Sequence, residues 1–313
     1  MQAGRRRFNL AAAGSLMSGL VHAQDKQGAA GSVTPAPAFA SPLPVRKTFR
    51  TSDGVALSYL DTEAAGKRPG LAIVLLPGWC MPASIWREQF ATLGAYCRVF
   101  ALDPRGQGES DIPAKGYTAP RRVADIDEFL NAVVPKRPRV LLVGWSLAAL
   151  EALEYVTTNG EARLAGLALI DSSVGELPAP KDGGGSGEGG FVRSLRADRE
   201  KMLSDFVRAI FAKPRPPEEI EALLQGALRI RLEDSIALLS YPFPREHWKE
   251  IAHRYTKPLL YAVTPQFSAQ AENLKKNRPE TRIEHFRRAG HALFVDEPDR
   301  FNKLILDFAR GLK

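Results

Sequence analysis

Residues 139–158 (RVLLVGWSLAALEALEYVTT) constrain the fold of this chain more than any other stretch. Residues 140–143 form an unbroken apolar run, which is typical of a strand buried on both faces of a parallel sheet. A helical pattern follows, and Gly144-Trp145-Ser146-Leu147-Ala148 lies between the two. This order predicts a strand, a sharp turn with Ser146 at its apex and a helix, which is the arrangement of a nucleophile elbow. The simpler alternative is a serine that caps a helix after a buried strand.

The rest of the chain alternates between strand and helix patterns. A hairpin is expected over residues 47–62, around Ser52-Asp53-Gly54. Further strands are expected at 71–76, 98–103, 164–171, 259–264 and 281–286, and helices at 83–95, 120–134, 269–276 and 298–312. Such alternation predicts a three-layer α/β sandwich with a mostly parallel, eight-stranded sheet.

The alternation stops at Val174. Residues 181–190 (KDGGGSGEGG) have the composition of a flexible loop, and residues 191–255 contain only helical patterns, for example at 198–211 and 218–240. A helical insertion after the sixth strand would lie over the carboxyl ends of the strands, where α/β sites form. The sequence therefore predicts a helical lid over about residues 175–255.

The first 23 residues have the pattern of an export signal. Arg5, Arg6 and Arg7 precede Phe8 and a mildly apolar run, which ends in Val21-His22-Ala23, a cleavage-site pattern. The Arg-Arg-x-Phe order resembles a twin-arginine signal, and a Sec signal or a membrane anchor are the alternatives. We expect cleavage after Ala23 and a periplasmic or secreted protein, with a disordered linker at 24–46 and one α/β domain at 47–313.

Composition excludes several other classes of protein. The chain has 313 residues and no stretch of about 18 apolar residues, so no membrane span is expected. The net charge is +8, of which Arg5–Arg7 supply three, and the remaining basic residues are scattered, which argues against nucleic acid as a partner. Cys80 and Cys97 are expected at opposite edges of a parallel sheet, too far apart for a disulfide.

Five motifs in order make residues 47–312 resemble the α/β-hydrolase superfamily. They are Ser52-Asp53-Gly54, Pro77-Gly78-Trp79, Asp103-Pro104-Arg105-Gly106-Gln107-Gly108-Glu109-Ser110, the Gly144–Ala148 elbow and Ala289-Gly290-His291. The loops are most similar to the cofactor-free haloperoxidase and esterase group. The resemblance implies a serine hydrolase without a cofactor, and no metal-ligand spacing or dinucleotide motif is present.

A hydroxyl nucleophile needs an adjacent base, and the base needs an orienting acid. Ser146 is the expected nucleophile and His291, in a loop after the last strand, the expected base. Most relatives carry the acid after the seventh strand, but residues 261–268 (YAVTPQFS) contain no carboxylate. A minority place it after the sixth strand, where this chain has Asp171. The alternatives are Asp171 as a strand cap, Glu272 as the acid, or a Ser–His dyad.

The backbone amides of Trp79 and Leu147 are the expected donors to the oxyanion of the reaction. Pro77 replaces the histidine that relatives have before the glycine. The rings of Trp79 and Trp145 are expected either to line an acyl pocket or to pack in the core. Asp103 and Arg105 are expected to form an ion pair that braces their loop rather than to take part in catalysis.

Three functions fit these residues. The first is an exported hydrolase that cleaves a small carboxylic ester or lactone through an acyl-enzyme. The second is a cofactor-free perhydrolase that uses the same triad. The third is a non-catalytic, ligand-binding protein with a hydrolase fold, a possibility raised by the missing acid after the seventh strand.

Overall fold

A computed structural model describes residues 44–63, 67–68, 70–137, 139–177, 189–240 and 243–312. The expected export signal at 1–23, the expected linker up to residue 43 and most of the glycine-rich loop at 181–190 lie outside these residues. The described chain forms one eight-stranded sheet in the order β1-β2-β4-β3-β5-β6-β7-β8. The strands are β1 (Val45–Arg50), β2 (Ala56–Asp61), β3 (Leu71–Leu76), β4 (Arg98–Leu102), β5 (Arg139–Trp145), β6 (Leu164–Ile170), β7 (Leu259–Val263) and β8 (Arg282–His285).

The sheet is parallel except at its first edge. β1 and β2 form an antiparallel hairpin, β2 is antiparallel to β4, and every later neighbouring pair is parallel. Strands β3, β6 and β7 are buried at every position, which explains their continuous apolar sequences. The carboxyl ends of β5, β6 and β7 consequently meet along one edge of the sheet.

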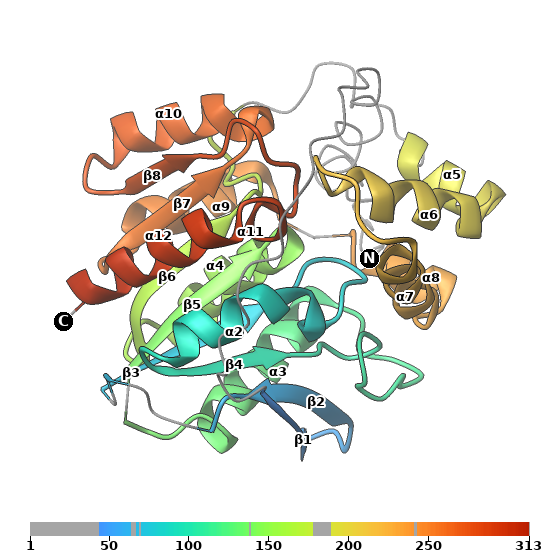
Figure 1. Cartoon of the computed structure of the whole chain (residues 1–313), viewed down its shortest axis with the longest axis horizontal. Helices are drawn as coiled ribbons and strands as arrows, with labels where there is room; N and C mark the ends of the chain where they lie inside the picture. Colours follow the sequence, from blue (N-terminus) through green and yellow to red (C-terminus); the bar gives the residue numbers. More distant parts are fainter. Residues whose placement is uncertain are drawn as a thin grey trace, which may run out of the picture.

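Helices cover both faces of the sheet (Figure 1). Helix α2 (Arg87–Gly94), which follows the short η1 (Ala83–Trp86), packs with α12 (Pro298–Gly311), while α4 (Leu147–Asn159) packs with α3 (Ala119–Ala132) and α9 (Arg245–Arg254). These two groups lie on opposite faces, and α10 (Ser268–Asn277) connects β7 to β8. The expected three-layer α/β fold is therefore confirmed. None of the helices in the described part of the chain is long and apolar enough to cross a membrane.

The segment between β6 and β7 is helical, as expected. Helices α5 (Gly190–Ala197), α6 (Arg199–Ala209), α7 (Pro217–Leu228) and α8 (Leu232–Ala237) lie together to one side of the sheet, in yellow to orange in Figure 1, and α9 follows them. The single helix expected at 218–240 was wrong, because α7 and α8 are separate. Arg199, at the start of α6, explains the break, since its guanidinium donates to the carbonyl oxygens of Ala227, Leu228 and Ile230 at the end of α7.

The first strand begins earlier than the sequence predicted. Val45 and Arg46, which were placed in the linker, belong to β1 and pair with Asp61 and Leu60 of β2. Arg46 donates through Nη1 to Asp103 Oδ2 at 2.5 Å, so an ion pair holds this end of the edge strand to the loop after β4. The contact spans 57 positions of the chain, and residue periodicity alone carries no information about it.

Candidate active site

Ser146 occupies a sharp turn between β5 and α4. Its φ of 58° and ψ of −120° lie outside the regions that non-glycine residues favour, so the backbone is strained there. Gly144 permits this turn, because a Cβ at that position would come within 2.4 Å of the Ala148 carbonyl oxygen. The Ser146 amide donates to Ile170 O at 2.9 Å, which ties the turn to the end of β6. The side chain is 2% exposed.

Asp171 directly follows β6 and is completely buried. Its Oδ2 lies 2.7 Å from His291 Nδ1, and its Oδ1 accepts a hydrogen bond from the Thr264 amide at 2.6 Å. Thr264 is the residue after β7, where the sequence has no carboxylate. The end of β7 thus contributes a backbone donor that orients Asp171, and Asp171 is the carboxylate that the structure brings to His291.

His291 lies between β8 and the short helix α11 (Leu293–Asp296), and it is 3% exposed. The indole Nε1 of Trp145 donates to the His291 carbonyl oxygen at 2.9 Å, and the Trp145 and His291 rings lie 5.1 Å apart. The residue before the elbow serine therefore holds the backbone of the histidine. Within the described residues, Ser146 and His291 are not hydrogen-bonded to each other in this conformation, a bond that often forms only when substrate is bound.

The turn after β3 lies against the serine. A Cβ on Gly78 would come within 3.0 Å of Ser146 Cβ, so the Gly78-Trp79 backbone passes directly beside the nucleophile position. Cys80 has a φ of 58°, which bends the turn. Leu147 is the first residue of α4, and the first N–H groups of a helix have no acceptor within it. The two segments that carry the amides expected to bind an oxyanion thus both adjoin Ser146.

Sequence reasoning missed Gln107, which supports this turn. Its side-chain amide donates to Gly78 O at 3.1 Å and to Met81 O at 2.8 Å, on both sides of Trp79. Arg122 donates to Gln107 Oε1 at 3.1 Å and forms an ion pair with Glu151 of α4, and all three side chains are buried. The one signal available in the sequence was the place of Gln107 in the Asp103–Ser110 motif.

The two tryptophans contact different parts of the molecule. The Trp79 indole is 1% exposed, donates to Ser235 O at 2.7 Å and packs edge-on against Phe191 and Phe206 of the lid helices. The Trp145 ring packs in the core against His291 and, edge-on, against Phe294. Trp79 therefore joins the turn after β3 to the lid, and Trp145 joins the elbow to the histidine loop.

The remaining charged candidates lie elsewhere. Glu272 is 72% exposed on α10 and pairs with His285 at 3.3 Å, so it does not reach His291. Asp103 accepts from the Ala83 amide at 2.6 Å and pairs with Arg46. Arg105 pairs with Asp125 at 2.6 Å and with Asp53 at 3.1 Å, rather than with Asp103. Both loop residues brace the loop after β4.

The two cysteines of the chain are not set up as nucleophiles. Cys80 and Cys97 are buried free thiols, and burial raises the pKa of Cys97 to about 12 and that of Cys80 further. A thiol with a raised pKa is protonated at neutral pH and is a poor nucleophile. Among the residues that the structure describes, no cluster of three or more His, Cys, Asp or Glu side chains is suited to a metal ion.

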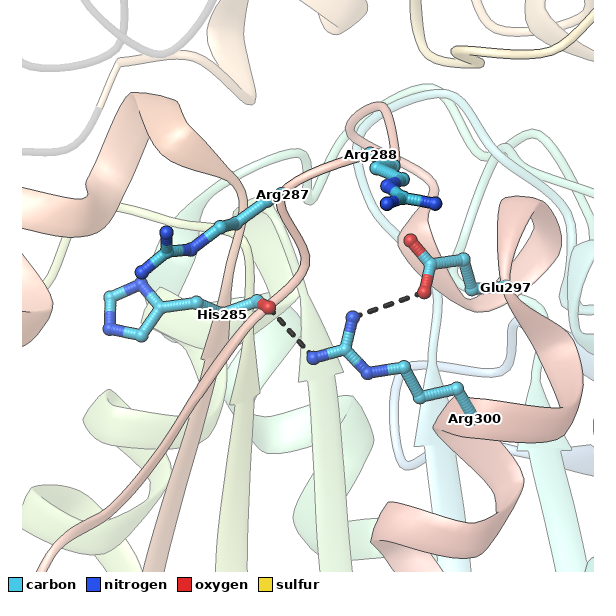
Figure 2. A pocket seen from close by; sticks show the side chains of 5 residues that line it. All are labelled: His285, Arg287, Arg288, Glu297 and Arg300. Atoms are coloured by element: carbon cyan, nitrogen blue, oxygen red, sulfur yellow. Dashed lines mark hydrogen bonds and ion pairs between the residues drawn. The ribbon is translucent and has the colours of Figure 1, made fainter.

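An open cavity of about 400 Å³ lies on the outer side of the loop that carries His291 (Figure 2). It is lined by His285, Arg287, Arg288, Glu297 and Arg300. Arg300 donates to His285 O at 2.8 Å and to Glu297 Oε2 at 3.0 Å. This polar cavity is separate from the buried Ser146, Asp171 and His291 side chains.

Comparisons with known proteins agree with this architecture. A family model described as the alpha/beta hydrolase family matches residues 73–304. The pimeloyl-(acyl-carrier protein) methyl ester esterase of Vibrio vulnificus (strain YJ016) is 24% identical over 278 residues, which cover 80% of this chain and 98% of that protein.

Two solved structures show the same fold. An esterase from Exiguobacterium antarcticum superposes with a TM-score of 0.70 at 23% identity, over 84% of this chain and 99% of its own. A bromoperoxidase from Bacillus anthracis superposes with a TM-score of 0.73 at 19% identity, over 85% of this chain and 100% of its own. With the family match spanning most of its length, the chain belongs to the alpha/beta hydrolase family.

Proposed function

We propose that the protein is a serine hydrolase that cleaves a small carboxylic ester or lactone through an acyl-enzyme. The observation that carries this proposal is the buried contact of 2.7 Å between Asp171 Oδ2 and His291 Nδ1, next to a strained serine turn. A buried carboxylate in this position holds the imidazole in the tautomer whose Nε2 accepts a proton. The missing carboxylate after β7 was the argument for a non-catalytic protein. The contact between Asp171, after β6, and His291 argues against that alternative.

Each residue then has a defined role. His291 Nε2 removes the Ser146 hydroxyl proton as Ser146 Oγ attacks the ester carbonyl carbon, and the Trp79 and Leu147 amides stabilise the oxyanion. The same imidazole returns the proton to the leaving alcohol when the carbon–oxygen bond breaks. Water, deprotonated by His291, then attacks the acyl-enzyme carbonyl carbon. When the bond between this carbon and Ser146 Oγ breaks, the imidazolium returns the proton to Oγ and the carboxylic acid leaves. Asp171 orients the imidazole and stabilises the imidazolium that forms.

The ester substrate class has further support. The Vibrio relative is named a methyl ester esterase and the Exiguobacterium structure an esterase. In this chain the Gly78-Trp79 turn lies against Ser146, and the Trp79 ring packs on Phe191 and Phe206 of the lid, so the side of this turn that faces the lid is apolar. An apolar, covered site suits an uncharged ester better than a charged substrate.

The test is the turnover of p-nitrophenyl butyrate and covalent labelling by a fluorophosphonate. Ser146→Ala is expected to abolish both, whereas Ser84→Ala, an exposed serine in η1, should change neither. Full turnover by the Ser146 variant would exclude the proposal, and a wild-type protein that neither reacts nor is labelled would indicate a binding role. Bromination of monochlorodimedone in acetate and peroxide tests the perhydrolase alternative.

We also propose that residues 1–23 direct export, probed separately from the chemistry. Replacing Arg5 and Arg6 by lysine is expected to leave the precursor uncleaved in the cell, because twin-arginine signals depend on that pair. N-terminal sequencing of the exported wild-type protein should begin at Gln24. Normal processing of the lysine variant would favour the Sec route.

A further inference from the structure

We propose that Asp296 is a positioning residue that fastens the His291 loop to the lid, so that lid closure sets the orientation of the catalytic base. This inference rests on the proposed function. It concerns a carboxylate that takes no part in the Ser146, His291 and Asp171 arrangement. Asp296 is the last residue of α11 and is 2% exposed.

The Asp296 carboxylate bridges two separate segments. Its Oδ2 accepts hydrogen bonds from the Gly290 amide at 2.7 Å and from the Ala212 amide at 2.8 Å, and its Oδ1 accepts from the Lys213 amide at 3.3 Å. Gly290 precedes His291, whereas Ala212 and Lys213 follow lid helix α6. One buried carboxylate thus holds the backbone of the histidine loop and the backbone of the lid together.

Two further contacts fix the same junction. The Ala292 amide donates to Ile210 O at 2.8 Å, and Lys213 Nζ donates to the main-chain oxygen of Asp296 at 2.5 Å. The lid backbone approaches so closely that a Cβ on Gly290 would lie 2.6 Å from Ala212 N. The lid segment therefore contacts the residues on both sides of His291.

The energetics of a buried carboxylate make this junction act as a unit. Hydrogen bonds to a carboxylate are stronger than those to a neutral acceptor, and a buried carboxylate that loses its donors is strongly destabilised. Two of the three donors to Asp296 belong to the lid. When the lid moves away, Asp296 must find solvent or other donors, and its bond to Gly290 can no longer hold the loop in the same position.

The neighbouring Glu297 provides a matched control. Its side chain points to the outer cavity and pairs with Arg300, as Figure 2 shows, and it makes no hydrogen bond to the lid among the described residues. Glu297→Gln changes the charge next to Asp296 in the sequence without touching the lid junction. This variant is expected to keep the wild-type kinetics.

The test is Asp296→Asn, with kcat and KM for p-nitrophenyl butyrate normalised by fluorophosphonate titration of Ser146. We expect kcat to fall about 10–100-fold with little change in KM, the size of effect typical of residues that orient a catalytic group. The pH profile of kcat/KM should shift as well, since it reports the base in the free enzyme. If Asp296 only stabilised the fold, the variant would contain a smaller fraction of protein that reacts with the fluorophosphonate. The pH profile of kcat/KM for that active fraction would then match the wild type.

Amide hydrogen exchange supplies a readout that does not depend on activity. In Asp296→Asn, peptides covering residues 210–213 and 289–292 should both exchange faster, while the Glu297→Gln variant should match the wild type. Lys213→Met, a milder change at an exposed side chain, should produce a smaller loss of kcat in the same direction. If Asp296→Asn has the kcat, pH profile and amide exchange of the wild type, the inference is wrong. If Ser146→Ala hydrolyses p-nitrophenyl butyrate as fast as the wild type, the proposed function is wrong instead.

Discussion

At the scale of single residues, the placement of the acid shows how a hydrolase-type site tolerates a change of position. Asp171 follows β6 and reaches His291 across 120 positions of the chain. Its other oxygen binds the Thr264 amide, so the vacant acid position after β7 still takes part through its backbone. The positive φ of 43° at Asp171 is uncommon for a residue other than glycine and turns the carboxylate toward the histidine loop.

Asp171→Asn should lower kcat for p-nitrophenyl butyrate by about 10⁴-fold, because an amide favours the wrong tautomer of the imidazole. Ser146 should remain present and the protein folded, as circular dichroism would show. Glu272→Gln is the control, since this exposed residue pairs with His285 and should leave kcat unchanged. A large effect at Glu272 with none at Asp171 would reassign the acid.

At the scale of elements, two glycines, one in a strand and one in a helix, have opposite roles. Gly144 is the next-to-last residue of β5, and the backbone of α4 fills the space where its Cβ would lie. Gly226 lies inside lid helix α7, where an added Cβ meets no atom within 4 Å. The first glycine is required by the approach of a helix to a strand, and the second has no such requirement.

Gly144→Ala is therefore expected to reduce the free energy of unfolding by about 1–3 kcal/mol, the usual cost of overpacking a core. Gly226→Ala should increase it by about 0.5–1 kcal/mol, because alanine is the better helix former. Urea denaturation of both variants measures the difference. A free energy of unfolding for Gly144→Ala equal to that of the wild type would show that the backbone at the elbow can shift to accommodate the added Cβ.

At the scale of the whole molecule, an ion-pair network joins the first hairpin to the rest of the fold. Arg105 is buried and contacts Asp53 in the hairpin turn and Asp125 on α3. The hydrogen bonds from Arg105 lower the pKa of Asp53 from 3.8 to about 2. Because this pKa is lower in the folded than in the unfolded state, the stabilisation is present above about pH 4 and is lost as the pH falls toward 2.

Asp53→Asn should consequently reduce the free energy of unfolding at pH 7 by about 1 kcal/mol, a value discounted for the partial exposure of the carboxylate to solvent. The difference in the free energy of unfolding between variant and wild type, measured by urea denaturation, should be smaller at pH 3 than at pH 4. A difference that stays constant over this range would mean that Asp53 acts through packing instead of charge.

Much of this architecture follows from local sequence. The continuous apolar strands, the alternation with helices and the glycine spacing of the elbow depend on neighbouring residues, so they predicted the sheet and the position of Ser146 correctly. The prediction of the lid helices was wrong where a distant residue affects a helix end. The lid helix expected at 218–240 divides into α7 and α8 at carbonyl groups that Arg199 caps from another helix.

The amino-acid sequence by itself determined the family fold, the strained serine turn and the absence of a carboxylate after β7, since each is written in residues close together in the chain. Only the tertiary structure decided that Asp171 contacts His291, that Gln107 supports the Trp79 turn and that Asp296 joins the lid to the histidine loop. Gln107 and Gly78 lie 29 positions apart in the chain, Asp296 and Ala212 of the lid 84, and Asp171 and His291 120. Their geometry depends on how strands and loops pack, which no local pattern specifies.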